Sequence, residues 1–187
     1  TLFAWRVVSW LMEKEESEVT TEFPEEMTEG TEPDFDNLWG IVTDGLIGAV
    51  GGLVGTASLT VGLLIAASLG VFDINEFATL AELTGLNALF ESNPAAVGYV
   101  LFLLGGMVMW PLLFASIGSY LPGETFALKG LPFGFVLWTG FAPAFYSEYT
   151  GLALVLYLLF TLGGHFAYGF TLGAVFDYLG DRPETLV

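Results

Sequence analysis

The chain contains a single histidine, His165, which lies inside the last long apolar run, from Gly151 to Phe176. Imidazole titrates near neutrality and ligates iron and copper, so this residue could hold a haem or a metal, or relay protons. A structural role explains it equally simply: a neutral histidine bonds across helices to a hydroxyl or a free carbonyl. The sequence favours the structural role, and His165 is retained as a candidate cofactor ligand.

Few other side chains could do chemistry beside it. Asp44 and Asp177 fall at the ends of apolar runs, where a pair could gather protons, although such acids usually mark the water boundary. Met107 and Met109 could supply a copper site or the second ligand of a His/Met haem, but packing explains them better. The chain has no cysteine, which excludes disulfides, iron–sulfur clusters and Cys-ligated zinc. Neither a nucleophile–base pair nor a phosphate-binding loop is evident, so we expect no enzyme activity and no resident cofactor or metal.

Small residues recur at helical spacing on two of the apolar runs. On a helix, residues four positions apart share a face, and glycine there leaves a notch through which a second backbone can approach. Such notches favour helix packing over a ligand path. The predicted packing residues are Gly48, Gly51, Gly52 and Gly55 in the first run, and Gly164, Gly169 and Gly173 in the last.

Composition indicates an integral membrane protein. The chain has 187 residues, of which 54% are hydrophobic and 13% charged, and several uncharged runs exceed the roughly 18 residues that mark a candidate span. The net charge of −17 rests on 21 acids against four cations, which excludes a nucleic-acid-binding surface. Acid-rich, lysine-poor exposed segments suit very high salt, so the composition favours a halophilic source; a partner with a basic face is the other explanation.

The pattern predicts an all-α integral membrane bundle of four transmembrane helices, with an interfacial helix between the first two. Residues 1–12 form an interfacial or docking helix, and residues 13–37 an acidic and largely irregular tail. Residues 38–187 form the membrane domain. Its predicted spans are 38–72, 94–120, 127–146 and 150–178, and the polar segment 73–93 is expected to lie on the membrane surface. Gly105, Gly106 and Pro111 predict a bend within the second span.

The four cations fix an orientation for this bundle. With four spans, both termini and the loop between the second and third spans share one side, and all four cations fall there: Arg6, Lys14, Lys129 and Arg182. Because cytoplasmic loops carry the excess of Lys and Arg, we expect a multi-pass protein of the cell membrane with both termini in the cytoplasm.

Two glycine motifs resemble those of a known group. The string Gly164-His165-x-x-Tyr168-Gly169-x-x-Leu172-Gly173, taken with Gly48-x-x-Gly51-Gly52-x-x-Gly55-Thr56, resembles small four-helix membrane proteins of haloarchaea. That group is largely uncharacterised and is often associated with haem–copper oxidase gene clusters. The resemblance covers residues 40–178 and implies an accessory role in a respiratory complex.

These observations together predict a non-catalytic accessory subunit of a membrane respiratory complex, a haem–copper terminal oxidase by the resemblance. It is expected to pack through its glycine-rich helix faces and to leave an exposed glycine-notched face for the partner. Its expected partners are the lipid bilayer and larger membrane subunits, in a hetero-oligomer. Two alternatives remain open: a small free-standing transporter or channel, and a haem-carrying electron-transfer subunit that uses His165. A transporter should enclose a polar cavity, and a haem subunit should absorb visible light.

Overall fold

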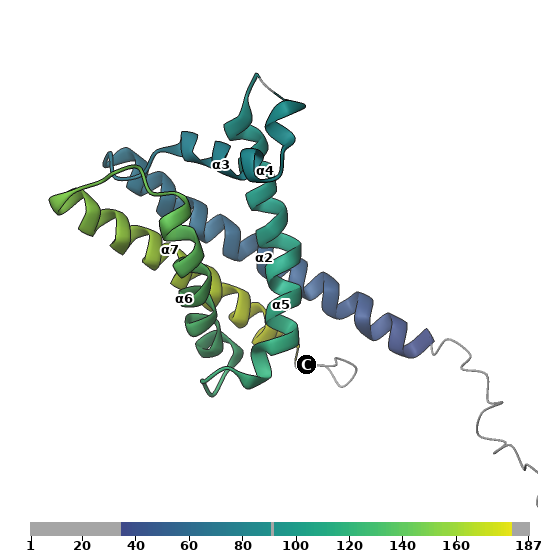
Figure 1. Ribbon diagram of the computed structural model, residues 1–187. Helices are drawn as coiled ribbons and strands as arrows, with labels where there is room; N and C mark the ends of the chain where they lie inside the picture. Colours follow the sequence, from purple (N-terminus) through teal and green to yellow (C-terminus); the bar gives the residue numbers. More distant parts are fainter. Residues whose placement is uncertain (1–34, 91, 181–187) are drawn as a thin grey trace, which may run out of the picture. The chain divides into compact units, whose positions relative to one another are not determined.

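The computed structural model describes residues 35–90 and 92–180, and every regular element in these ranges is a helix (Figure 1). The backbone divides into two compact units, residues 1–38 and 39–187, and the features discussed below belong to the second unit. The predicted docking helix at 1–12 and nearly all of the acidic tail at 13–37 lie outside the described residues.

Helix α2 (Phe35–Ser68) is the first of the long apolar helices. The sequence predicts a span that continues to residue 72, but the helix ends four residues earlier. Gly70 explains the difference, because it adopts a left-handed φ of 69°, and Val71 N–H bonds to Ala66 O while Gly70 N–H bonds to Ala67 O. This pair of bonds is a Schellman motif, which satisfies the last carbonyls and turns the chain away.

The polar segment that follows forms three short helical turns. They are η2 (Ile74–Phe77), α3 (Ala78–Leu83) and η3 (Leu86–Ala88). Asp73 caps the first turn by accepting a bond of 2.9 Å from Asn75 N–H. Gly98 lets the segment dock on the next helix, since a Cβ there would overlap the carbonyl of Phe77. Its predicted position on a membrane surface remains a prediction.

The second long helix is interrupted by a π-helical turn. It consists of α4 (Pro94–Leu104), the π-turn η4 (Gly105–Met109), α5 (Trp110–Ile117) and the short 3₁₀ turn η5 (Gly118–Tyr120). Asn93 caps its start by accepting a bond from Ala96 N–H, and Pro94 occupies the first turn, where its missing N–H costs nothing. The sequence predicts an irregularity at this place, and the structure shows its form.

Helices α6 (Phe126–Ala144) and α7 (Gly151–Leu179) form an antiparallel hairpin and lie side by side (Figure 1). Their backbones approach closely at glycines from both helices. A Cβ on Gly130 would overlap the carbonyl of Gly169, and one on Gly134 would overlap the carbonyl of His165. Such contacts give dispersion and Cα–H···O attraction, which drive helix association in lipid.

Three helices are long and apolar enough to cross a membrane: Val42–Ser68, Pro94–Tyr120 and Gly151–Leu179. The predicted third span at 127–146 corresponds to α6, which is not among them. Its 19 residues include Lys129 and the internal prolines Pro132 and Pro143, which lower its apolarity. The described residues therefore define an all-helical membrane protein with three candidate spans, and the predicted count of four is not confirmed.

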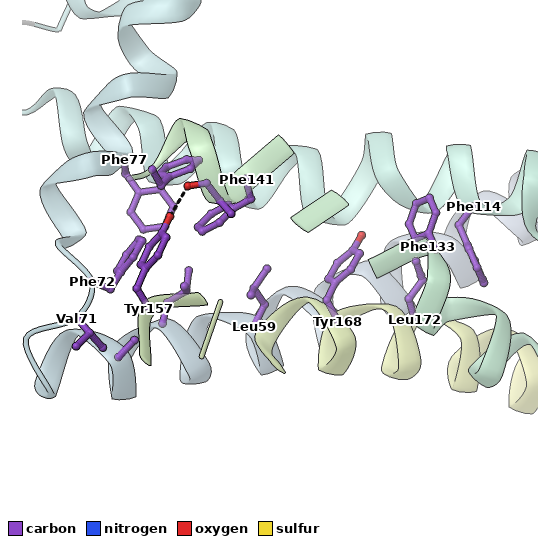
Figure 2. Packing of buried hydrophobic residues seen from close by; sticks show 14 of the residues in the cluster. Leu59, Val71, Phe72, Phe77, Phe114, Phe133, Phe141, Tyr157, Tyr168 and Leu172 are labelled. Carbon is purple, nitrogen blue, oxygen red and sulfur yellow. Dashed lines mark hydrogen bonds between the residues drawn. The ribbon is translucent and has the colours of Figure 1, made fainter. Parts of the chain in front are cut away.

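Aromatic side chains gather at the two ends of the helix packing (Figure 2). Phe72, Phe77 and Phe141 lie at one end, with ring centroids 5.8 Å apart for Phe72 and Phe77. Phe114 and Phe133 lie at the other, 5.0 Å apart. Because the first cluster joins α4 to α6 and the second joins α5, α6 and α7, each cluster holds several helices together.

Candidate functional site

His165 is buried, with 4% of its surface exposed, and its ring packs on Phe141 at a centroid distance of 4.7 Å. Its Nδ1 lies 2.8 Å from the carbonyl oxygen of Thr161, one turn earlier on α7. A carbonyl only accepts, so Nδ1 carries the proton and Nε2 keeps the lone pair. The expected bond to another helix is therefore wrong for Nδ1, whose partner belongs to its own helix. Nε2 makes no hydrogen bond with the described residues.

The turn below the histidine is held by a small polar network. The Thr161 hydroxyl donates to the carbonyl of Tyr157 at 2.7 Å and accepts from the indole N–H of Trp138 at 3.0 Å. Tyr157 in turn donates to the carbonyl of Ala142 on α6 at 2.7 Å, shown by the dashed line in Figure 2. These bonds connect α6 to α7 and fix the carbonyl that orients His165.

His165 lines a groove of about 840 Å³. One wall comes from α4, the π-turn and α5, and the other from α6; α2 and α7 contribute Thr56, Leu59, His165 and Tyr168. None of the described residues that line it is charged, and the great majority of them are apolar. This groove is therefore unlike the polar cavity that a solute transporter requires.

The π-turn beside the groove is stabilised from α7. Trp110 N–H bonds to Gly105 O, five residues back, so the next acceptor in that register is Gly106 O. Its partner would be the N–H of residue 111, which is proline and has none. The hydroxyl of Tyr168 donates to Gly106 O instead, at 2.8 Å. Sequence reasoning included Tyr168 in a glycine motif but assigned it no role, and its distance in sequence from Gly105, Gly106 and Pro111 does not indicate this bond.

The seven predicted packing glycines all have close neighbours within the chain. The four on α2 face two helices: Gly48 and Gly52 approach Pro111 on α5, while Gly51 and Gly55 approach Leu172 and Tyr168 on α7. On α7, Gly164 faces Leu59, and Gly169 and Gly173 face α6. A Cβ on Gly52 would overlap the carbonyl of Gly106, so α2 crosses the second span at the π-turn. These notches are occupied internally.

Asp177 has a specific structural partner. Its two carboxylate oxygens accept the N–H groups of Phe126 and Ala127, each at 2.8 Å. These amides are among the donors left over at the N-terminus of α6, and a negative charge there also suits the helix dipole. Asp177 therefore caps a helix about fifty residues earlier in the chain. Neither a water-boundary role nor a proton-gathering pair predicts this.

The two methionines separate. Met109 lines the groove together with His165, whereas the backbone of Met107 lies against Gly52. Among the described residues no group of three or more His, Cys, Asp or Glu side chains could hold a metal ion.

At the turn between α6 and α7, the hydroxyl of Ser147 donates a hydrogen bond to Glu76. Burial raises the pKa of the nearby Tyr149 above its ordinary value, so that its phenol stays neutral.

This architecture defines the class: an all-helical membrane protein with long apolar helices and a mostly apolar lateral groove. Residues 42–187 match the model of a family of unknown function, DUF6789, and the chain belongs to that family. No curated protein and no solved structure shows significant similarity to the chain.

Proposed function

We propose that the chain is a non-catalytic membrane subunit that packs against larger membrane proteins. One observation supports this proposal: the polar side chains inside the long helices make hydrogen bonds to helix carbonyls. Thr56, Thr161 and Thr171 donate to carbonyls of their own helix, and Tyr157 and Tyr168 donate to carbonyls of neighbouring helices. Such bonds hold helices in place but leave few groups for catalysis or for a solute pathway.

We propose four spans, with α6 as the third. Helix α6 runs beside α7 from the level of Asp177 to that of Tyr157, and its 19 residues extend about 28 Å, close to the ~30 Å hydrocarbon core. Four spans place Lys129 on the same side as the other three cations, which supports cytoplasmic termini and a location in the cell membrane.

The seven predicted packing glycines do not form the partner surface that the sequence leads us to expect, because their notches are occupied within the chain. The second span offers another surface, because it is the least buried of the three candidate spans. Large apolar side chains on α4–α5 remain exposed outside the groove, among them Val100 and Leu112. A terminal oxidase of a haloarchaeon is the partner that the motif resemblance favours.

Mild-detergent extraction from the native membrane, followed by size exclusion and mass spectrometry, tests this function. The expected result is co-elution with larger membrane chains in a fixed ratio. A deletion strain for this chain should then show a loss of assembly or activity of the same complex. If the protein migrates alone or as a homodimer, the accessory-subunit function is wrong.

A haem-carrying subunit is the second candidate, and the structure gives it one specific support. His165 donates Nδ1–H to a backbone carbonyl, as metal-binding histidines commonly do, and Met109 lines the same groove. Against it, the described part of the chain places no cation on the groove that could pair with haem propionates. We expect the purified chain to lack a haem spectrum, and His165→Gln to preserve any activity of the host complex. A visible Soret band that disappears in His165→Gln would establish the haem function instead.

A further inference from the structure

We propose that the groove between α4–α5 and α6 binds an elongated, uncharged amphiphile: an isoprenoid or acyl chain that ends in a hydroxyl group, which donates a hydrogen bond to Nε2 of His165. This goes beyond the subunit function, because the groove lies within one chain and needs no partner.

The groove has the shape that a hydrocarbon chain requires. Its lining residues on the second span run from Leu101 to Ile117, which corresponds to about 24 Å of helix. Its volume of about 840 Å³ lies within the range of ligand pockets, roughly 300–1,000 Å³. Lining residues on both walls, such as Val108 and Val136, are themselves exposed, so the groove opens sideways. A ligand dissolved in the bilayer can therefore enter laterally.

The lining excludes charged headgroups. A phosphate or carboxylate buried here would lack a cation, and an ammonium would lack an anion, because residues 35–90 and 92–180 place no Asp, Glu, Lys or Arg on the groove. The hydroxyls of Thr56 and Tyr168 are already donated, to Gly52 O at 2.6 Å and Gly106 O at 2.8 Å. An uncharged ligand is the kind that this environment accepts.

One acceptor at the groove remains for the ligand. His165 is 4% exposed and lines the groove, its Nδ1–H is committed to Thr161, and Nε2 has no partner in the described part of the chain. An acceptor that faces an apolar groove without a donor is costly, so the groove favours a ligand that donates. The indole of Trp110 also lines the groove and shows no hydrogen bond within residues 35–90 and 92–180. A hydroxyl can donate to the imidazole and accept from an indole, whereas an ether only accepts.

The full chain in lipid nanodiscs provides the test, with radiolabelled geranylgeraniol as the probe and its methyl ether as a competitor without a donor. The alcohol should bind roughly three- to twentyfold more tightly than the ether, the range that one interhelical hydrogen bond in a membrane would give. His165→Leu should remove that preference while the ether still binds.

A matched pair of glycines tests the position. A Cβ meets nothing within 4 Å at Gly140, which lines the groove, or at Gly163, which does not. Gly140→Leu should fill the groove and abolish binding of both probes, while Gly163→Leu should leave binding unchanged. Equal affinity for alcohol and ether would show that bilayer acyl chains merely fill the groove. That result, or full binding by Gly140→Leu, would overturn the proposal, whatever the partner experiment gives.

Discussion

In the second span, the hydroxyl of Tyr168 supplies a hydrogen bond that a backbone amide supplies in an ordinary helix. Proline at position 111 removes the N–H that the π register assigns to Gly106 O, and the phenol of Tyr168 supplies a donor from another helix. Tyr168 is buried where α2, α4–α5 and α7 meet. Figure 2 shows its side chain pointing away from α7. A local backbone defect is thus repaired by a long-range contact.

Tyr168→Phe should therefore lower the free energy of unfolding by about 1–3 kcal/mol, because it leaves a buried carbonyl without a donor. Unfolding in mixed micelles, followed by circular dichroism, measures this. Tyr178→Phe is the control, since Tyr178 lies on the same helix, is 84% exposed and makes no hydrogen bond with described residues. Equal effects of the two substitutions would contradict the assigned role.

Asp177 supports a second prediction at this scale. Asp177→Ala should cost about 1–2 kcal/mol, as the loss of a helix cap does, and should speed hydrogen exchange at the amides of Phe126 and Ala127. Asp177→Asn keeps one acceptor oxygen, so its loss of stability should be smaller than that of Asp177→Ala. Glu124→Ala removes a neighbouring exposed acid that makes no bond in the described ranges, and should have little effect. Unchanged exchange in Asp177→Ala would exclude the cap.

At the scale of elements, α6 and α7 approach each other through glycines that leave no room for a side chain. Gly130 and Gly140 lie on the same helix, yet a Cβ on Gly130 would overlap the carbonyl of Gly169, while one on Gly140 would meet open space. The two positions therefore separate the effect of helix contact from that of helix propensity.

Gly130→Ala should destabilise the hairpin by about 1–3 kcal/mol, because the helices must move apart. Gly140→Ala should be neutral or stabilising by up to about 1 kcal/mol, since alanine is the better helix former. The midpoints of thermal denaturation of both variants, measured in the same detergent, test this difference in stability. Equal midpoints would mean that the hairpin contact contributes little to stability.

Helix positions were largely predictable, because they depend on apolar runs and local breakers. The second span at 94–120 and the last at 150–178 agree with Pro94–Tyr120 and Gly151–Leu179 to within a residue. The partners of individual groups were not predictable. The bonds from Tyr168 to Gly106 and from Asp177 to α6 join distant segments, and sequence spacing carries no record of such contacts.

The candidate site shows the same division. His165 could be singled out as an ionisable residue in an apolar run. Its orientation could not, because the helix rotation that brings it to a groove wall depends on packing against α2 and α6. The glycine spacing indicated close contacts but not which helices would fill them.

At the scale of the whole molecule, the number of spans decides the topology. The chain has no cysteine, so single introduced thiols report location without background. With four spans, Glu124→Cys and Thr150→Cys flank α6 on opposite sides of the membrane. A membrane-impermeant maleimide applied to intact cells should therefore label Thr150→Cys and not Glu124→Cys. Labelling of both or of neither would place the two ends of α6 on one side and contradict four spans.

We expect the cap on α6 to affect how the chain enters the bilayer during synthesis. Helix α6 emerges from the ribosome before Asp177, the residue that binds its first amides, and it carries Lys129 and two internal prolines. Alone, it is a poor candidate for release into lipid. With α7 it gains a cap and a glycine-matched partner. The translocon would then retain α6 until α7 arrives and release the two as one hairpin, so truncation before α7 should leave α6 uninserted.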